Sequence, residues 1–180
     1  NNDRPGIMLS NSAKKYLNKY GVAPGKNLVF FTNNDSAYET AIDFFKQGIK
    51  VEAIVDTRDN SDGYFPKKAN ELGITIIKGH EISDTVGRLK IREVKLKKIT
   101  TKNNNEKSSI NIKCDLLAIA GGWTPTVHLF TQSKGKLKFR DVDASFIPNE
   151  VYQDTLCVGS CNGDYNLNEI LIKTQEDAYK

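Results

Sequence analysis

The chain has 180 residues, which is enough to bury a hydrophobic core and predicts one domain or one domain with extensions. Its net charge of +4 is modest, and its lysines are spread along the sequence without interleaved aromatic residues, so we expect no nucleic-acid surface. No apolar run approaches the roughly 18 residues of a membrane span, and the N-terminal residues lack the pattern of a signal peptide. We therefore expect a cytoplasmic protein without a membrane contact.

The sequence starts at Asn1 without an initiator methionine and finishes on a helical pattern, so we expect an excerpt from a longer polypeptide. Its three cysteines, Cys114, Cys157 and Cys161, are an odd number without the C-x-x-C spacing of zinc sites. Cys157 and Cys161 could lie near each other, but no cluster of histidines accompanies them. We expect buried, reduced cysteines and no metal site.

The first predicted helix, Ser12–Tyr20, is ended by Gly21. Leu28 to Phe31 then form a short apolar run of β-preferring residues, as expected for a strand buried on both faces. After a polar turn, a helical pattern carries Ala37, Ala41, Phe44 and Phe45 on one side and stops at Gly48. A second apolar strand, Val51–Val55, ends at Asp56. Strand, turn, helix and a strand that ends in an acid form the first half of a dinucleotide-binding unit.

The turn departs from the G-x-G-x-x-G/A fingerprint of such units, because Thr32, Asn34 and Ala37 stand at the three glycine positions. The side chain of Asn34 intrudes where a pyrophosphate would lie. Asp35 suits the helix dipole but repels phosphate. The sequence positions that could still contact a cofactor at this end of the sheet are Thr32, Asn33, Asn34, Asp35, Ser36 and, through a ribose hydroxyl, Asp56.

Two interpretations of this turn remain open at this point. In the first, the unit keeps its shape only for packing, and Asp35 or Ser36 serves as a helix cap. In the second, it is a working nucleotide site with unusual turn chemistry. Arg58, in the loop Thr57–Gly63, is either a ligand contact or a surface residue.

The chain continues with a predicted helix, Phe65–Leu72, and a third parallel strand, Ile74–Ile77. Residues 89–100 alternate apolar and polar side chains and have a partner in Ser109–Lys113, which predicts an antiparallel hairpin with one wet face. A further buried strand, Cys114–Ala120, leads to Gly121 and Gly122. These two glycines are candidate ligand contacts, because strand C-termini line the crevice where α/β proteins bind ligands.

The predicted fold class is therefore α/β, with a Rossmann-like parallel sheet and an inserted antiparallel β-meander. The order of elements resembles the NAD-type domain of flavoprotein reductases with two dinucleotide domains, where a strand ends in A-x-G-x-x-P. A strand over Thr155–Ser160, with Gly159 as a candidate cofactor contact, and a helix over Asn168–Tyr179 complete the pattern. The resemblance implies that residues 1–22 lead in from a neighbouring dinucleotide domain, 23–122 form the NAD-type domain, and 123–180 return to the neighbour.

The amino-acid sequences of several segments indicate a narrower family than the order of elements does. Together they resemble the α subunits of heterotetrameric sarcosine oxidases: NNDRPGIMLS, YGVAPGK, FTNNDSAY, CDLLAIAGGWTPTVHLF, QSKGKL and VGSCNG. The resemblance covers nearly all of the chain in the same order. It implies an oxidoreductase that demethylates sarcosine to glycine, with hydrogen peroxide as a product and a one-carbon unit passed to tetrahydrofolate.

The resemblance also implies cofactors and partners. In that family the α subunit binds NAD, while FAD and FMN belong to the parent complex, and the partners are the β, γ and δ subunits and the rest of the α subunit. An intact glycine-rich fingerprint is expected upstream of Asn1. We therefore expect no catalytic residue in this chain, and a scaffold role for a nucleotide domain whose phosphate loop is degenerate.

Two further functions stay open. One is a competent NAD(P)-binding reductase domain, and the other is a subunit-interaction module without a ligand, which an exposed apolar patch would favour. His128, at a predicted helix start, is expected to pack or cap rather than act as a base, since neither a nucleophile nor an acid stands beside it. Trp123 could either stack on a cofactor ring or cover the end of the sheet.

Overall fold

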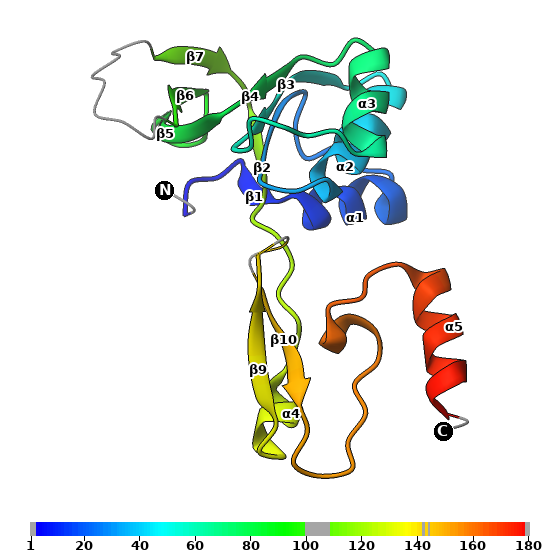
Figure 1. Cartoon of the computed structure of the whole chain (residues 1–180). Helices are drawn as coiled ribbons and strands as arrows, with labels where there is room; N and C mark the ends of the chain where they lie inside the picture. The colour runs from blue at the N-terminus through cyan, green and yellow to red at the C-terminus, as the bar shows by residue number, and fades with distance from the viewer. Residues whose placement is uncertain (1–2, 100–108, 142, 144, 179–180) are drawn as a thin grey trace. The chain divides into compact units, whose positions relative to one another are not determined.

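The computed structural model describes residues 3–99, 109–141, 143 and 145–178. The chain divides into two compact units, Asn1–Gly122 and Trp123–Lys180. Figure 1 traces both units along the chain. The assignment of residues 1–22 and 123–180 to a neighbouring dinucleotide domain stays a prediction, although residues 7–20 add a strand and a helix to the first unit.

The first unit is built on a five-stranded parallel sheet with the strand order β1-β8-β2-β3-β4. Successive side chains of its central strand point to opposite faces, so Leu28 and Phe30 pack on one side while Val29 and Phe31 pack on the other. Both faces of β2 are covered, which explains why its sequence is a continuous apolar run. The strands are β1 (Ile7–Leu9), β2 (Asn27–Thr32), β3 (Lys50–Asp56), β4 (Ile76–Lys78) and β8 (Leu116–Ala120).

Three helices cover one face of this sheet (Figure 1): α1 (Ser10–Tyr20), α2 (Ser36–Lys46) and α3 (Tyr64–Glu71). Gly21 ends α1 in the left-handed conformation, with φ of 63°, and its amide donates to the carbonyl oxygen of Leu17. Phe45, expected on the buried side of α2, is 38% exposed, whereas Tyr38 is fully buried there. The buried face of α2 therefore includes Tyr38 in place of Phe45, which the sequence pattern had put there.

The opposite face is covered by a three-stranded antiparallel sheet of β5 (His80–Val86), β6 (Glu93–Lys98) and β7 (Ile110–Lys113). Val94 and Leu96 of β6 point inward and are buried, while the lysines between and after them face outward. The predicted α/β class, with a Rossmann-like sheet and an inserted meander, is confirmed.

Two strands of this unit were not predicted. Strand β1 is three residues long and pairs with β8 as a sheet edge, so its sequence carries too little pattern to be recognised. Strand β5 has a register shift between Ile82 and Asp84, and this irregularity interrupts the alternation of apolar and polar residues.

The second unit contains α4 (His128–Gln132), a hairpin of β9 (Lys136–Arg140) and β10 (Ser145–Glu150), the 3-10 helix η1 (Gly159–Asn162), and α5 (Leu167–Ala178). The predicted C-terminal helix is confirmed as α5. The strand expected over residues 155–160 is wrong, because residues 155–158 carry no regular structure and η1 follows. A strand needs a neighbour for its backbone hydrogen bonds, and the described sheet of this unit pairs β9 with β10.

Apart from Pro125, the buried apolar side chains among the described residues of this unit are Phe130 and Ile147. Helix α5 has no buried residue. An ion pair supports the hairpin, in which Arg140 Nε donates to Asp143 Oδ1 at 2.9 Å, and Arg140 Nη2 also donates to the carbonyl oxygen of Gly163 at 2.9 Å. Within the parts of both units that the structure describes, no helix is long and apolar enough to cross a membrane.

Candidate functional site

The predicted contact residues of the first unit meet at the carboxyl ends of its central strands. Thr32 is in register with Ala120 of β8 on one side and with Asp56 of β3 on the other. The turn after β2 thus lies between Asp56 and the Gly121–Gly122 segment, where parallel α/β sheets bind their ligands.

The turn itself is held by hydrogen bonds between its own residues. The buried Thr32 hydroxyl donates to the carbonyl oxygen of Asn34 at 2.8 Å and accepts from the Asn34 amide at 3.1 Å. The side-chain oxygen of Asn34 in turn accepts from the backbone amide of Ser36 at 3.0 Å and from its hydroxyl at 2.5 Å. The Ser36 amide, at the N-terminus of α2, could donate to a phosphate oxygen. It already donates to Asn34 instead.

Side-chain amides also connect this turn to β8. Asn33 Nδ2 donates to the carbonyl oxygen of Gly121 at 3.2 Å, and Asn34 Nδ2 donates to Asn33 Oδ1 at 2.8 Å. A Cβ built on Gly122 would lie 3.5 Å from Asn33 Oδ1. The two asparagines thus link the carboxyl ends of β2 and β8.

Asp56, the acid expected to contact a ribose, is fully buried, and both of its carboxylate oxygens are bonded. Oδ2 accepts from the Tyr38 hydroxyl at 2.7 Å and from Arg58 Nη2 at 2.8 Å. Oδ1 accepts from the Arg58 backbone amide at 3.0 Å and from its Nε at 3.1 Å. The Asp56 carboxylate is therefore bonded to both the backbone and the side chain of Arg58, and to Tyr38 of α2.

The ionisation of these partners follows from the same contacts. Burial raises the pKa of Tyr38, so its hydroxyl keeps its proton and donates to Asp56. The hydrogen bonds that Arg58 donates to Asp56 raise the pKa of Arg58 above its ordinary value, and the hydrogen bond that it donates to Asp35 adds to this effect. The Tyr38 phenol therefore stays neutral and the Arg58 guanidinium stays cationic.

Arg58 extends the network to the turn, because its Nη2 also donates to Asp35 Oδ1 at 2.7 Å. The Asp35 carboxylate lies against Gly63, where a Cβ would stand 1.8 Å from Asp35 Oδ2. We define the Arg58 network as Asp35, Tyr38, Asp56 and Arg58. Arg58, which the sequence left open as a ligand contact or a surface residue, lies at the centre of this network and forms ion pairs with Asp35 and Asp56.

The other singled-out residues lie in the second unit. Gly159 begins η1 with φ of 75°, a left-handed conformation that glycine adopts without strain. His128 does begin α4 as predicted, but its side chain is exposed rather than packed. Trp123 is half exposed, and its ring centroid lies 6.0 Å from that of Tyr165.

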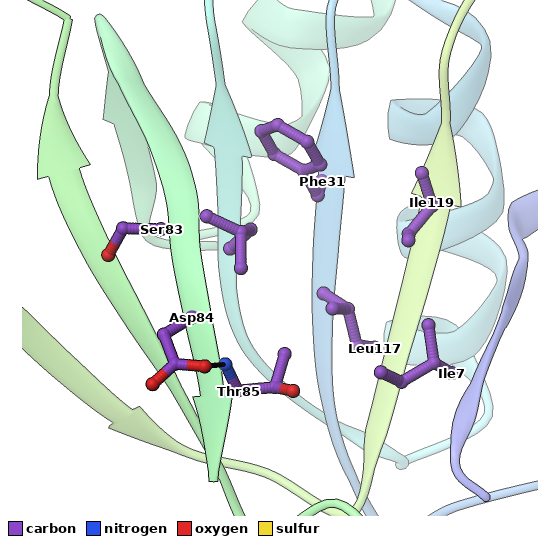
Figure 2. Close-up of a pocket in the computed structure, with 8 residues that line it drawn as sticks. Ile7, Phe31, Ser83, Asp84, Thr85, Leu117 and Ile119 are labelled. Atoms are coloured by element: carbon purple, nitrogen blue, oxygen red, sulfur yellow. Dashed lines mark hydrogen bonds between the residues drawn. The ribbon is translucent and has the colours of Figure 1, made fainter. Parts of the chain in front are cut away.

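A separate pocket of about 260 Å³ lies in the first unit, between the parallel sheet and β5 (Figure 2). Its floor is apolar, and the chain segment Ser83–Thr85 forms the polar rim. Asp84 accepts from the Thr85 amide at 2.8 Å and from Lys95 Nζ at 3.3 Å, so the rim is bonded within the protein. The apolar lining consists of Ile7, Phe31, Ile82, Leu117 and Ile119.

No family model matches this sequence. Among solved structures, the chain is similar to a thioredoxin reductase from T. acidophilum, with a TM-score of 0.60 and 16% identity over 98% of this chain and 59% of that one. It is also similar to an FAD-dependent pyridine nucleotide-disulphide oxidoreductase from Desulfovibrio vulgaris, with a TM-score of 0.52 and 14% identity over 81% and 40% of the two chains. The chain thus has the fold of the pyridine nucleotide-disulfide oxidoreductases.

Sequence relatives define a narrower relationship. The alpha subunits of sarcosine oxidase from Corynebacterium sp. strain U-96 and strain P-1 are 31% and 33% identical to it, each over 91% of this chain. The chain spans 17% of the length of each of these relatives. It is homologous to one segment of sarcosine oxidase alpha subunits, and the resemblance stated from its sequence segments is confirmed.

Proposed function

We propose that this chain is a nucleotide-fold region of a sarcosine oxidase alpha subunit, in which it acts as a scaffold and its own nucleotide site is filled by protein side chains. The observation that carries the proposal is Asp56, which is fully buried and bonded through both oxygens to Arg58 and Tyr38. A ribose hydroxyl would have to displace one of these partners.

The phosphate side of the site supports the same proposal. A pyrophosphate needs free backbone amides at the start of the helix and a turn without side chains. Here the Asn34 side chain accepts from the Ser36 amide, and the Asp35 carboxylate adds a negative charge beside it. The residues present therefore do not fit a dinucleotide, and we derive no chemical step through NAD, FAD or FMN at this turn.

For the parent enzyme, we propose the reaction that the homology implies, which is oxidative demethylation of sarcosine to glycine with formation of hydrogen peroxide. NAD would belong to the alpha subunit outside this turn, and FAD and FMN to the complex with the β, γ and δ subunits. The candidate residues of this chain hold the fold, and we assign none of them to catalysis.

A role in subunit interaction is the second candidate, and the second unit favours it. Helix α5 buries none of its residues, and Leu171 and Ile172 on it are 60% and 59% exposed. Exposed apolar side chains gathered on one helix are typical of a packing surface. This function is compatible with a scaffold role, since both use the chain for assembly rather than for ligand binding.

Calorimetric titration of the full chain with NAD, NADP and FAD tests the proposal against a competent NAD(P)-binding domain. We expect no saturable heat at millimolar ligand. Saturable micromolar binding would overturn the scaffold proposal if Asp56→Ala weakened it and the exposed control Asp62→Ala left it unchanged. That result would establish a working cofactor site. A circular dichroism spectrum of each variant shows whether it remains folded.

A further inference from the structure

Two of the three cysteines lie four positions apart in the second unit. Cys157 and Cys161 are free and partly exposed, whereas Cys114 is only 3% exposed in the core of the first unit. The sequence prediction that all three would be buried is therefore wrong for this pair. Partial exposure makes a thiol accessible to small oxidants, and burial protects Cys114.

The backbone brings the two thiols together. Gly159 lies midway between them with φ of 75°, a conformation that glycine adopts without strain, and η1 begins there. The Cys161 thiol donates to the carbonyl oxygen of Val158 at 3.1 Å, which folds it back toward the preceding residues. This contact places the Cys161 sulfur beside Val158, the residue that directly follows Cys157, so the two cysteines lie at one turn.

We propose that Cys157 and Cys161 form a dithiol that a hydroperoxide converts into an intramolecular disulfide. One thiolate attacks the peroxide, an S–O bond forms, the O–O bond breaks, and water leaves after protonation. The second thiolate then attacks the resulting sulfenic acid, the S–S bond forms, and a second water leaves. The two thiols supply the two electrons that reduce the peroxide.

The spacing favours the second step over further oxidation. Because the partner thiol is held beside the sulfenic acid by a short turn, its attack is intramolecular and needs no encounter with another molecule. Burial, followed by the neighbouring Cys161, raises the pKa of Cys157. The reaction should therefore accelerate as the pH rises through the neutral and alkaline range, since only the thiolate is nucleophilic.

This inference goes beyond the proposed function. A parent sarcosine oxidase would release hydrogen peroxide, but the chemistry of the dithiol does not depend on that source. An experiment with added peroxide therefore tests the dithiol alone, and its failure would leave the scaffold proposal as it stands.

Treatment of the full chain with hydrogen peroxide, followed by alkylation and tryptic mass spectrometry, tests the proposal. Cleavage after Arg140 and Lys173 leaves both cysteines on one peptide, because no lysine or arginine lies between, while Cys114 falls on another. We expect the first peptide to lose two hydrogen atoms and both alkylation sites, and a dithiol reductant to restore them. The peptide with Cys114 should remain alkylated.

Variants of single cysteines show which two thiols form the disulfide. Cys157→Ser should abolish the intramolecular disulfide and leave a sulfenic acid on Cys161 that dimedone traps, while the control Cys114→Ser should leave disulfide formation unchanged. Three results would overturn the proposal: two thiols that stay alkylatable, sulfinic acid that accumulates without a disulfide, or a disulfide whose yield rises with protein concentration because it joins two chains.

Discussion

Apart from prolines, the first unit buries twenty-one apolar side chains among its described residues, whereas the second buries Phe130 and Ile147. In the first, a parallel sheet is covered on both faces, by helices on one and by a meander on the other. In the second, a hairpin and α5 leave most large apolar residues exposed. Since burial of apolar surface is the main stabilising contribution to folding, the first unit gains more stability from its core, and the proposed role in subunit packing falls to the second.

The polar groups differ in the same way. The first unit buries Asp56 and pairs it with Arg58 and Tyr38, so the end of its sheet is closed by internal bonds. The second unit keeps its main ion pair, Arg140 with Asp143, about one-third exposed. A filled site belongs to the unit with a core, because only a packed interior can hold a desolvated carboxylate in one position.

The largest expected effect concerns the cores. Phe30→Ala removes a fully buried ring from the first unit and should lower its free energy of unfolding by about 3–5 kcal/mol. The matched change in the second unit, Phe146→Ala, removes a ring that is 54% exposed and should cost about 0.5 kcal/mol or less. Urea denaturation followed by circular dichroism measures both. Equal losses would contradict the contrast between the units.

The next largest effect concerns the Arg58 network. Asp56→Asn keeps the shape of the side chain but removes the charge that Arg58 and Tyr38 contact, and it should destabilise the first unit by about 2 kcal/mol. The exposed Asp62→Asn serves as the control and should change stability little. If Asp56→Asn proved as stable as the natural chain, the network would not hold the end of the sheet.

A smaller effect is expected at Gly63, which touches Asp35. A methyl group there would stand 1.8 Å from Asp35 Oδ2, so Gly63→Ala must push the carboxylate away from Arg58 and should cost about 1 kcal/mol. Gly121→Ala is the matched control, because a Cβ on Gly121 meets no atom within 4 Å. Equal stability of the two variants in denaturant titration would show that Asp35 is not held in place.

The smallest effect is a pH dependence in the second unit. The hydrogen bond from Arg140 lowers the pKa of Asp143 to about 2, below its value of about 3.9 in an unfolded chain. A lowered folded pKa means that the pair stabilises the unit fully above about pH 4 and loses this contribution as the pH falls toward 2. Fluorescence of Trp123, the single tryptophan, should report this loss, and Arg140→Gln should abolish its pH dependence. An unchanged acid transition in that variant would refute the assignment.

Regular patterns in the first unit could be predicted from the sequence. Apolar runs such as Leu28–Phe31 and helix stops such as Gly21 and Gly48 predicted the strands and helices of the sheet, and the alternation around Val94 predicted β6. In the second unit α5 was predicted but the strand over residues 155–160 was wrong, because residues 155–158 have an apolar strand pattern and no strand among the described residues of the unit pairs with them. Pairing is a tertiary property that a local pattern does not encode.

The sequence predicted which residues gather at this end of the sheet, but not the hydrogen bonds between them. Thr32, Asn34 and Asp56 do meet at the carboxyl end of the sheet. Tyr38 was missed as a partner of Asp56, since a tyrosine in the first turns of a helix carries no signal of where its hydroxyl will point. The proximity of Arg58 to Asp56, two residues apart, was the available hint that the acid is paired within the chain.

The most direct test is hydrogen exchange of the backbone amides of residues 32–36 in the full chain, measured with and without millimolar NAD. These amides include the Ser36 N–H that bonds to Asn34. If the site is filled by its own side chains, NAD should leave every exchange rate in this turn unchanged. Slowing of these amides by about tenfold or more, which corresponds to about 1.4 kcal/mol of added protection, would show that NAD binds here and would contradict the account.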